Sequence, residues 1–373
     1  MASRLGPEHF VAVALAVLAS GGIGSAVAQE PAQTAQVGRA TLTFGGGVAT
    51  LTLPDVAAVV TRSNAGGTRQ LLGRFIFSDD FGHEFGWNVN GALSVPFDGP
   101  GGKPMAVGLS GFWARIEGDD SFVCSGSGEP GVDCLVMPLV DNAVVQQFGG
   151  TLGAETIAGQ TNRKVDQWGV ALEAKLYRDL DSSVFHDAFV AVGADMRGIY
   201  QDLNSQMVAS TGARISYTES LDTTYYGGFA AIGATYVPPL FGGLWDRLGL
   251  ESSFRLQGGV YYANTQYDGT LAHTAPFPVG GGNPSGGLSL TRDDTAFIGG
   301  ISLQTAKRIG ARAKLSLKSD IEYYSFVPSV AFNERDRGPI TIAGSERRAG
   351  TSIDRDDAWS FRTMLNLSIA LGN

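Results

Sequence analysis

The chain has 373 residues and a formal net charge of −9, from 27 basic and 36 acidic side chains. This acidic balance gives no support for a nucleic-acid partner, because nucleic-acid phosphates call for a basic patch. The length allows two soluble domains or one large domain built from sheet, and the many alternating segments described below favour the second.

The first 28 residues are typical of a secretory signal peptide. Arg4 precedes an apolar run over 10–18, and Ala26-Val27-Ala28 is a small-x-small cleavage site. An N-terminal membrane helix is the alternative, but the run is well short of the roughly 20 apolar residues that a spanning helix needs. We therefore predict export, with removal of residues 1–28 from the mature protein.

Residues 29–67 are expected to lie outside the main fold. Thr41-Leu42-Thr43-Phe44 and the apolar stretch 48–53 flank Gly45-Gly46-Gly47, a pattern that indicates a short hairpin ended by Pro54. We interpret 29–67 as a periplasmic or lumenal extension. The alternative is an extra pair of strands.

From residue 68 onward, apolar and polar side chains alternate with the period of two that is typical of a strand. Polar stretches separate ten such segments. They cover about 68–77, 86–97, 105–115, 167–177, 187–200, 224–237, 253–262, 297–305, 314–323 and 359–371.

The last segment is the clearest. Its apolar face carries Trp359, Phe361, Leu365, Leu367, Ile369 and Leu371. A typical soluble strand has about 5–6 residues. A tilted strand that crosses a bilayer needs about 9–11, which this segment satisfies.

Three further features favour a membrane barrel over a secreted β-sandwich. Tyrosine and tryptophan gather near segment ends, as in Tyr261-Tyr262 and Tyr323-Tyr324, which is typical of two membrane–water girdles. Short connections alternate with long polar ones, over 116–164, 201–223, 264–294 and 326–357. Ten strands is an even number and places both ends in the periplasm.

These features resemble the outer-membrane β-barrel proteins of diderm bacteria, over residues 68–373. The resemblance implies an all-β, antiparallel, up-and-down transmembrane barrel of about ten strands (alternatively twelve), with long extracellular loops and short periplasmic turns. It also implies an integral outer-membrane location, contact with outer-membrane lipid and lipopolysaccharide, and insertion by the barrel assembly machinery. Members usually end on an aromatic residue, whereas this chain ends Leu371-Gly372-Asn373.

Charged side chains on the polar faces are predicted to line the lumen. They are Arg74, Glu173, Lys175, Asp195, Arg197, Arg255, Lys314, Lys318, Asp320, Glu322 and Arg362. Either they neutralise one another and fill the lumen, or they line a narrow pore. About eight strands leave a filled interior and 16–18 an open channel, so ten strands favour a largely plugged lumen. We expect a structural, surface-interaction or minor permeability role, with a small diffusion pore as the alternative.

Little in the sequence indicates catalysis, a metal or a cofactor, and we predict none of them. A hydrolase at the outer rim is a lower alternative, with His83 beside Asp79, Asp80 and Glu84. Cys124 and Cys134 lie ten residues apart in a polar stretch, and in an oxidising compartment this spacing predicts a disulfide that restricts a loop.

Overall fold

The computed structural model of the protein describes residues 39–54, 56–63, 70–77, 85–125, 132–136, 156–179, 185–210, 212, 214–236, 242–274, 286–334 and 349–372. The predicted signal peptide lies outside these residues.

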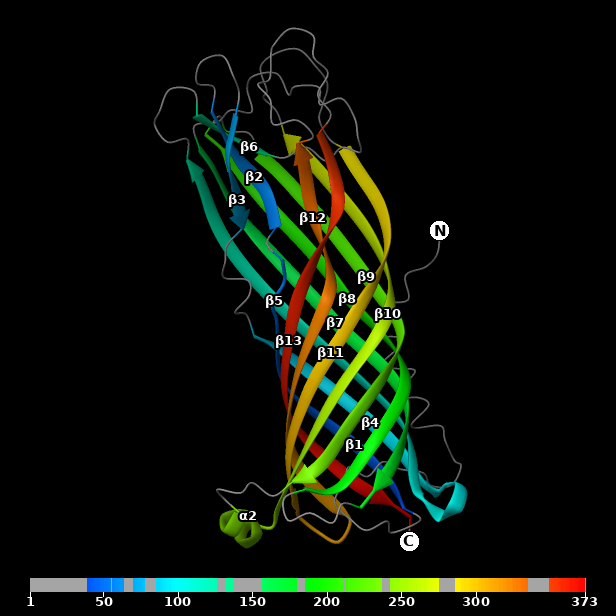
Figure 1. The fold of residues 1–373 in the computed structure, drawn as a ribbon. Helices are drawn as coiled ribbons and strands as arrows, with labels where there is room; N and C mark the ends of the chain where they lie inside the picture. The colour runs from blue at the N-terminus through cyan, green and yellow to red at the C-terminus, as the bar shows by residue number, and fades with distance from the viewer. Residues whose placement is uncertain are drawn as a thin grey trace.

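Ten antiparallel strands form a closed barrel (Figure 1), which confirms the predicted fold class. The strands are β1 (Ala40–Leu51), β4 (Gly86–Asp98), β5 (Pro104–Ser125), β7 (Thr156–Arg178), β8 (Phe185–Ala209), β9 (Arg214–Tyr236), β10 (Leu250–Thr274), β11 (Gly286–Arg308), β12 (Ala313–Glu334) and β13 (Ala349–Leu371). Their order around the ring is β1-β13-β12-β11-β10-β9-β8-β7-β5-β4.

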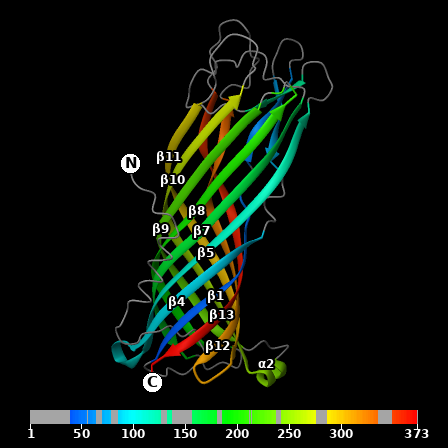
Figure 2. The ribbon, with the colours of Figure 1, turned by 180° about the vertical axis from the view of Figure 1, so that it is seen from behind.

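Three short strands form a separate sheet in the order β3-β2-β6. They are β2 (Val56–Ser63), β3 (Gln70–Phe77) and β6 (Val132–Val136). A 3-10 turn (Pro100–Gly102) joins β4 to β5, and the short helix α2 (Gly242–Leu248) lies before β10. In Figures 1 and 2 the C-terminus and α2 lie at one end of the barrel, which we call the inner end. No helix in the described part of the chain has the length and apolar character needed to cross a membrane.

The first barrel strand is not the predicted one. The candidate over 68–77 forms β3 of the small sheet, whereas β1, from the range interpreted as an extension, pairs with both β13 and β4. The run Gly45-Gly46-Gly47 is not a hairpin turn but the middle of this strand. A Cβ at Gly45 would overlap Asn366, and one at Gly47 would overlap the Thr363 carbonyl, so glycine here permits the close approach of β13 that closes the ring.

Most strands are also longer than predicted. β1 and β4 have 12 and 13 residues, but the other eight have 22 to 25. Much of what was expected to be long loop, such as 116–125, 201–209 and 264–274, is therefore strand. Only the inner half of each long strand has alternating apolar and polar residues, so only this half was predicted from the sequence.

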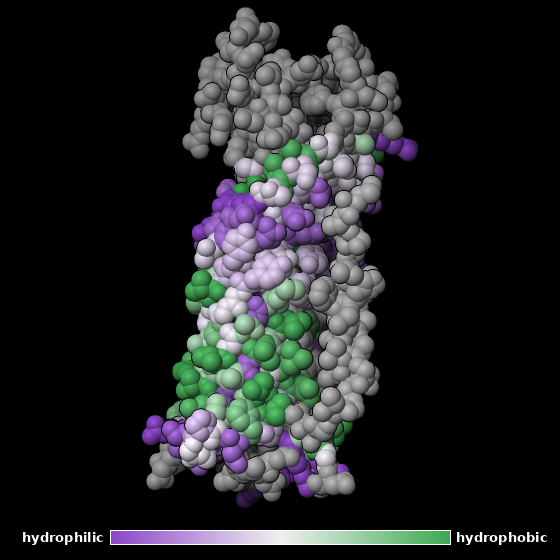
Figure 3. Space-filling view, turned by 90° about the vertical axis from the view of Figure 1, so that its right-hand side faces the viewer, coloured by the Kyte–Doolittle hydropathy of each residue, from purple (hydrophilic) through white to green (hydrophobic). Residues whose placement is uncertain are grey.

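The outward face of the barrel changes character halfway along. On β10, Leu256, Val260 and Tyr262 are 40%, 64% and 51% exposed, whereas Asn264 and Gln266 take the next outward positions. Figure 3 shows the apolar surface over the inner half and the hydrophilic surface beyond it. An exposed apolar band on a closed sheet is what lipid requires, so the inner half spans the membrane and the outer half projects from it.

Aromatic side chains mark the outer boundary of this band. They are Trp87, Trp113, Tyr200, Tyr226, Tyr262, Tyr323 and Trp359, while Trp168 at the same level is buried against its neighbours. Several are in ring contact across neighbouring strands, with centroids 4.6 Å apart for Trp87 and Trp113 and 5.0 Å apart for Tyr323 and Trp359. Such a ring is the girdle expected at a membrane–water interface.

Substituting Gly47→Ala is expected to destabilise the barrel by roughly 1–3 kcal/mol or prevent its closure, because the new Cβ would overlap backbone of β13. The control is Gly91→Ala, where the nearest atom to the new Cβ lies 3.9 Å away. The fraction of unboiled protein with altered mobility in a denaturing gel measures closure. Equal fractions for the two variants would contradict this account of β1.

Candidate functional site: the barrel lumen

The predicted lumenal charges gather in the inner half of the barrel. Ten of the eleven line a single cavity of about 830 Å³. They are Glu173 and Lys175 of β7, Asp195 and Arg197 of β8, Arg255 of β10, Lys314, Lys318, Asp320 and Glu322 of β12, and Arg362 of β13. The exception is Arg74, which belongs to β3 of the separate three-stranded sheet and whose side chain is not among those described, so its lumenal position stays a prediction.

This cavity, which we call the inner vestibule, reaches the inner end of the barrel. Its lining includes Arg39, just before β1, and residues 310–313 at the short turn between β11 and β12. In barrels of this kind the short turns face the periplasm. The vestibule therefore extends to the periplasmic end of the molecule.

Arg197 lies at the centre of the charge network. Its Nε is 2.8 Å from Asp195 Oδ2, and its Nη1 is 2.8 Å from Glu322 Oε1. Glu322 also lies 2.7 Å from Arg362 Nη2. All four side chains are buried, and Arg197 on β8 reaches Glu322 on β12, which is four places away in the ring. These pairs span the lumen.

A second network links β7 and β10. Glu173 accepts a hydrogen bond of 2.8 Å from Arg255 Nη1 and lies 3.1 Å from Lys175 Nζ. The Arg362 guanidinium lies 3.7 Å from the centre of the Phe112 ring, a cation–π contact across another part of the lumen. Opposite charges are therefore interleaved, as buried charges require.

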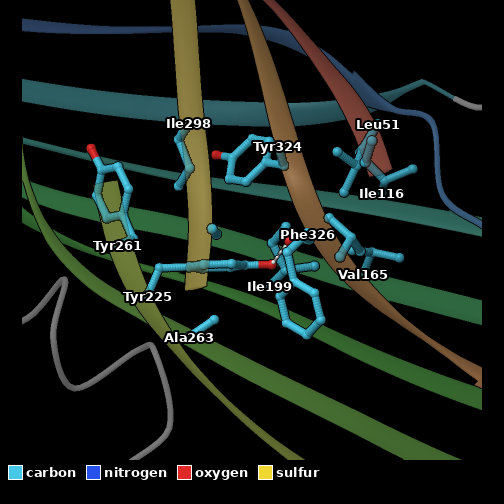
Figure 4. Packing of buried hydrophobic residues seen from close by; sticks show 13 residues of the cluster. Leu51, Ile116, Val165, Ile199, Tyr225, Tyr261, Ala263, Ile298, Tyr324 and Phe326 are labelled. Atoms are coloured by element: carbon cyan, nitrogen blue, oxygen red, sulfur yellow. Dashed lines mark hydrogen bonds between the residues drawn. The ribbon is translucent and has the colours of Figure 1, made fainter. Parts of the chain in front are cut away.

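A cluster of apolar and aromatic residues fills the lumen on the outer side of these charges (Figure 4). We call it the lumenal closure. It comprises Leu51, Ile116, Val165, Ile199, Tyr225, Tyr261, Ala263, Ala296, Ile298, Tyr324, Phe326, Val327 and Ala358, all buried. Its residues come from nine of the ten barrel strands, so it is a cross-section of the whole ring.

Hydrogen bonds fix the closure across the full diameter. Gln167 Nε2 donates to Tyr324 Oη at 2.9 Å, and Ser360 Oγ donates to Gln167 Oε1 at 3.0 Å. β7 and β12, which carry Gln167 and Tyr324, are five places apart in a ring of ten and so lie opposite each other. Tyr225 Oη donates to the Phe326 carbonyl at 2.9 Å. Side chains that meet across the diameter occupy the lumen at this level.

The closure was missed because its tyrosines were assigned to the membrane girdles. In Tyr261-Tyr262 and Tyr323-Tyr324, successive side chains point to opposite faces of the strand. Tyr262 is exposed to lipid, whereas Tyr261 and Tyr324 are buried in the lumen. Such adjacent aromatic pairs were the signal that could have revealed the closure.

The chain enters the lumen directly after β1. Leu53 packs against the closure, and the Pro54 carbonyl accepts a hydrogen bond of 3.3 Å from Arg163 Nη1. Arg163 also donates to Gln201 Oε1 at 2.6 Å. Residues 53 and 54 of the predicted extension are therefore lumenal, which accords with the lumenal alternative for this short part of 29–67.

The outer half contains a buried carboxyl group beyond the girdle. Tyr217 donates a hydrogen bond to Glu219, and Tyr217 Oη lies 3.4 Å from Tyr267 Oη. Burial raises the pKa of Glu219 above its ordinary value, and the bond from Tyr217 and the nearby Arg163 guanidinium offset this only in part. Burial next to Glu219 also raises the pKa of the Tyr217 hydroxyl.

The remaining predicted residues are placed as follows. Trp359, Phe361, Leu365 and Leu371 are exposed on the outer face of β13, and Leu367 and Ile369 are half-buried on the same face. Cys124 is fully buried near the outer end of β5. Its disulfide with Cys134 stays a prediction, because the Cys134 side chain is not among those described. The predicted rim group around His83 lies outside the described residues.

Within the described residues, no group of three or more His, Cys, Asp and Glu side chains could hold a metal ion.

No protein-family model matches the chain, and neither does any curated protein sequence. Solved structures with a similar arrangement include the outer membrane protease OmpT from Escherichia coli, at 10% identity and a TM-score of 0.41, covering 91% of this chain and 99% of that one. The translocator domain of the autotransporter NalP from Neisseria meningitidis has 11% identity, a TM-score of 0.31 and 90% coverage of both chains. An outer membrane channel from Pseudomonas putida F1 has 10% identity and a TM-score of 0.24, covering 92% of this chain and 100% of that one. Likeness at this level carries no inference about activity.

Arg197→Met is expected to lower the free energy of unfolding by about 3–5 kcal/mol, because it leaves the buried Asp195 without its partner and removes a partner of Glu322. The matched control is Arg355→Met, whose ion pair with Asp294 is half exposed and worth about 0–1 kcal/mol. Urea unfolding in lipid vesicles measures both. Similar losses for the two variants would show that the lumenal network is no more important than a surface ion pair.

Glu219→Gln is expected to flatten part of the pH dependence of stability. Since the pKa of Glu219 is higher in the folded barrel than in the unfolded chain, the native stability is greatest below the ordinary glutamate range and falls as pH rises through the raised pKa. The glutamine still accepts the bond from Tyr217 but cannot ionise, so the variant should be the more stable at pH 8 and lose this advantage at pH 4. Urea unfolding at the two pH values tests the sign, and a variant that is less stable at pH 8 would contradict it.

Proposed function

We propose that the protein is an integral outer-membrane barrel whose lumen does not conduct ions or solutes. Its role is to present the surface of its long outer half at the cell exterior. The observation that supports a non-conducting barrel best is the lumenal closure. Next to it, Gln167 of β7 is hydrogen-bonded to Tyr324 of β12, the opposite strand, and to Ser360 of β13. A pore at this level would require these contacts to break.

The length of the strands supports the second part of the proposal. On β10, the twelve residues from 263 to 274 lie beyond Tyr262 of the girdle. They correspond to about 40 Å of strand at roughly 3.3 Å per residue. A barrel that served only as an inert membrane span would not need this projection, since about 9–11 residues suffice to cross.

The outer half also has the surface of a part that meets water or lipid headgroups. Its outward positions include Asp202, Asp222, Asp268 and Asp293. Near the girdle they are interspersed with basic side chains such as Lys164, which suit contact with the phosphates of lipopolysaccharide. Outer-membrane lipid is the partner that this arrangement favours.

The proposal assigns no catalytic role. In the lumen, the carboxyl groups of Glu173, Asp195 and Glu322 are each engaged by an Arg or Lys side chain. Carboxylates that are held in ion pairs by basic side chains of the barrel wall support a structural use of these groups.

Conductance across planar lipid bilayers tests the closed lumen. The purified protein is expected to give no stable current steps. The combined substitution Gln167→Ala, Tyr225→Ala and Tyr324→Ala should produce them, because it removes the side chains that meet across the diameter.

The control replaces three aromatic residues that face lipid, Tyr226→Ala, Tyr262→Ala and Tyr323→Ala, and should remain silent. Stable steps from the unsubstituted protein would replace the proposal with the alternative of a small diffusion pore.

A further inference from the structure

The lining of the inner vestibule is positively charged, whereas the chain as a whole is negatively charged. Nine basic and five acidic side chains line the vestibule, a surplus of four positive charges, although the whole chain has a net charge of −9. If these groups served only to neutralise one another in a filled lumen, equal numbers would suffice. The surplus gives the vestibule a net positive charge.

The surplus is concentrated at the mouth. Arg39, Arg308, Arg312 and Lys314 line the end of the vestibule next to the short turn between β11 and β12, and Glu251 is the acidic residue of the lining at that level. Lys314 Nζ lies 2.6 Å from Glu251 Oε2. A cavity entrance with one dominant sign of charge draws in ions of the opposite sign.

The deeper wall carries buried polar atoms without a hydrogen-bond partner. Arg362 is 5% exposed and Asn366 is 2% exposed, and both line the vestibule. Arg362 Nη1 is a donor without a partner, whereas Asn366 Oδ1, also without a partner, is an acceptor and does not attract an anion. The guanidinium is a group suited to bidentate recognition of carboxylate or phosphate, and its plane is already positioned by Phe112 and Glu322.

The dimensions fit a small molecule. The cavity of about 830 Å³ lies within the range of roughly 300–1,000 Å³ that is typical of ligand sites. The closure bounds the vestibule on its outer side, and its mouth lies at the periplasmic end. A ligand would therefore enter and leave from the periplasm.

From these observations we propose that the inner vestibule binds a small oxyanion with two or more negative charges, carried by phosphate or carboxylate groups. Arg39 and Arg312 attract it at the mouth, and Arg362 receives it at depth. This proposal goes beyond the surface role proposed above and does not depend on it, because binding from the periplasm leaves the closure intact.

Isothermal titration of the full chain in detergent micelles tests the proposal, with pyrophosphate and citrate as phosphate and carboxylate probes and spermidine as a polycation of similar size. Saturable binding of at least one anion at low salt is expected, weakening as added NaCl screens the charges. Which anion binds more tightly distinguishes the two chemistries. Binding of neither, or equal binding of spermidine, would overturn the proposal.

A pair of charge reversals locates the site. Arg39→Glu with Arg312→Glu, both exposed at the mouth, should weaken anion binding at least about tenfold. The matched control, Arg178→Glu with Arg247→Glu, makes the same change in charge at exposed positions of the inner end that do not line the cavity. Equal weakening in the two pairs would assign the binding to general surface charge and refute the vestibule as the site. Conductance is a separate measurement, so either proposal can fail without the other.

Discussion

A sheet that lies in hydrocarbon must leave no backbone donor or acceptor unpaired, and this requirement governs the barrel from its first strand to its last. β13 satisfies it at one edge through β12, but its other edge needs β1, which in turn must reach β4. Glycines 45 and 47 make that possible, since any side chain there would collide with β13. The ring therefore depends on two residues that carry no side chain at all.

Closure of the ring determines what the interior must contain. A ring of ten strands is narrow, so side chains from opposite walls touch, and the buried inward side chains are largely apolar or joined in ion pairs. The structure uses both solutions at different heights. At the girdle, tyrosine, phenylalanine and aliphatic side chains fill the lumen. Nearer the periplasm, the ion pairs around Arg197 and Glu173 line a cavity of about 830 Å³. The two levels follow from one geometric limit.

The same geometry explains which parts of the fold could be predicted from the sequence. Period-two alternation identified nine of the ten barrel strands and the ten lumenal charges on them, because facing is a local property of a strand. It missed β1, whose three glycines show no alternation and whose place depends on contact with β13, over 300 residues away. It also missed the outer halves of the strands, where both faces carry polar residues, and it placed Arg74 on a barrel strand, whereas β3 belongs to the separate three-stranded sheet. Contacts across the lumen, such as that of Gln167 with Tyr324, join residues 157 apart and have no local signature.

The closure divides the molecule into two parts that face different compartments. With the lumen closed as proposed, groups beyond the closure, such as Glu219, exchange protons or ligands with the cell exterior, and groups before it, such as Arg362, with the periplasm. The surplus of positive charge in the vestibule and the acidic outward positions of the outer half, such as Asp202 and Asp268, therefore lie on opposite sides of the closure. Under the proposed closure, the basic lining of the vestibule faces the periplasm, while those acidic positions face the cell exterior.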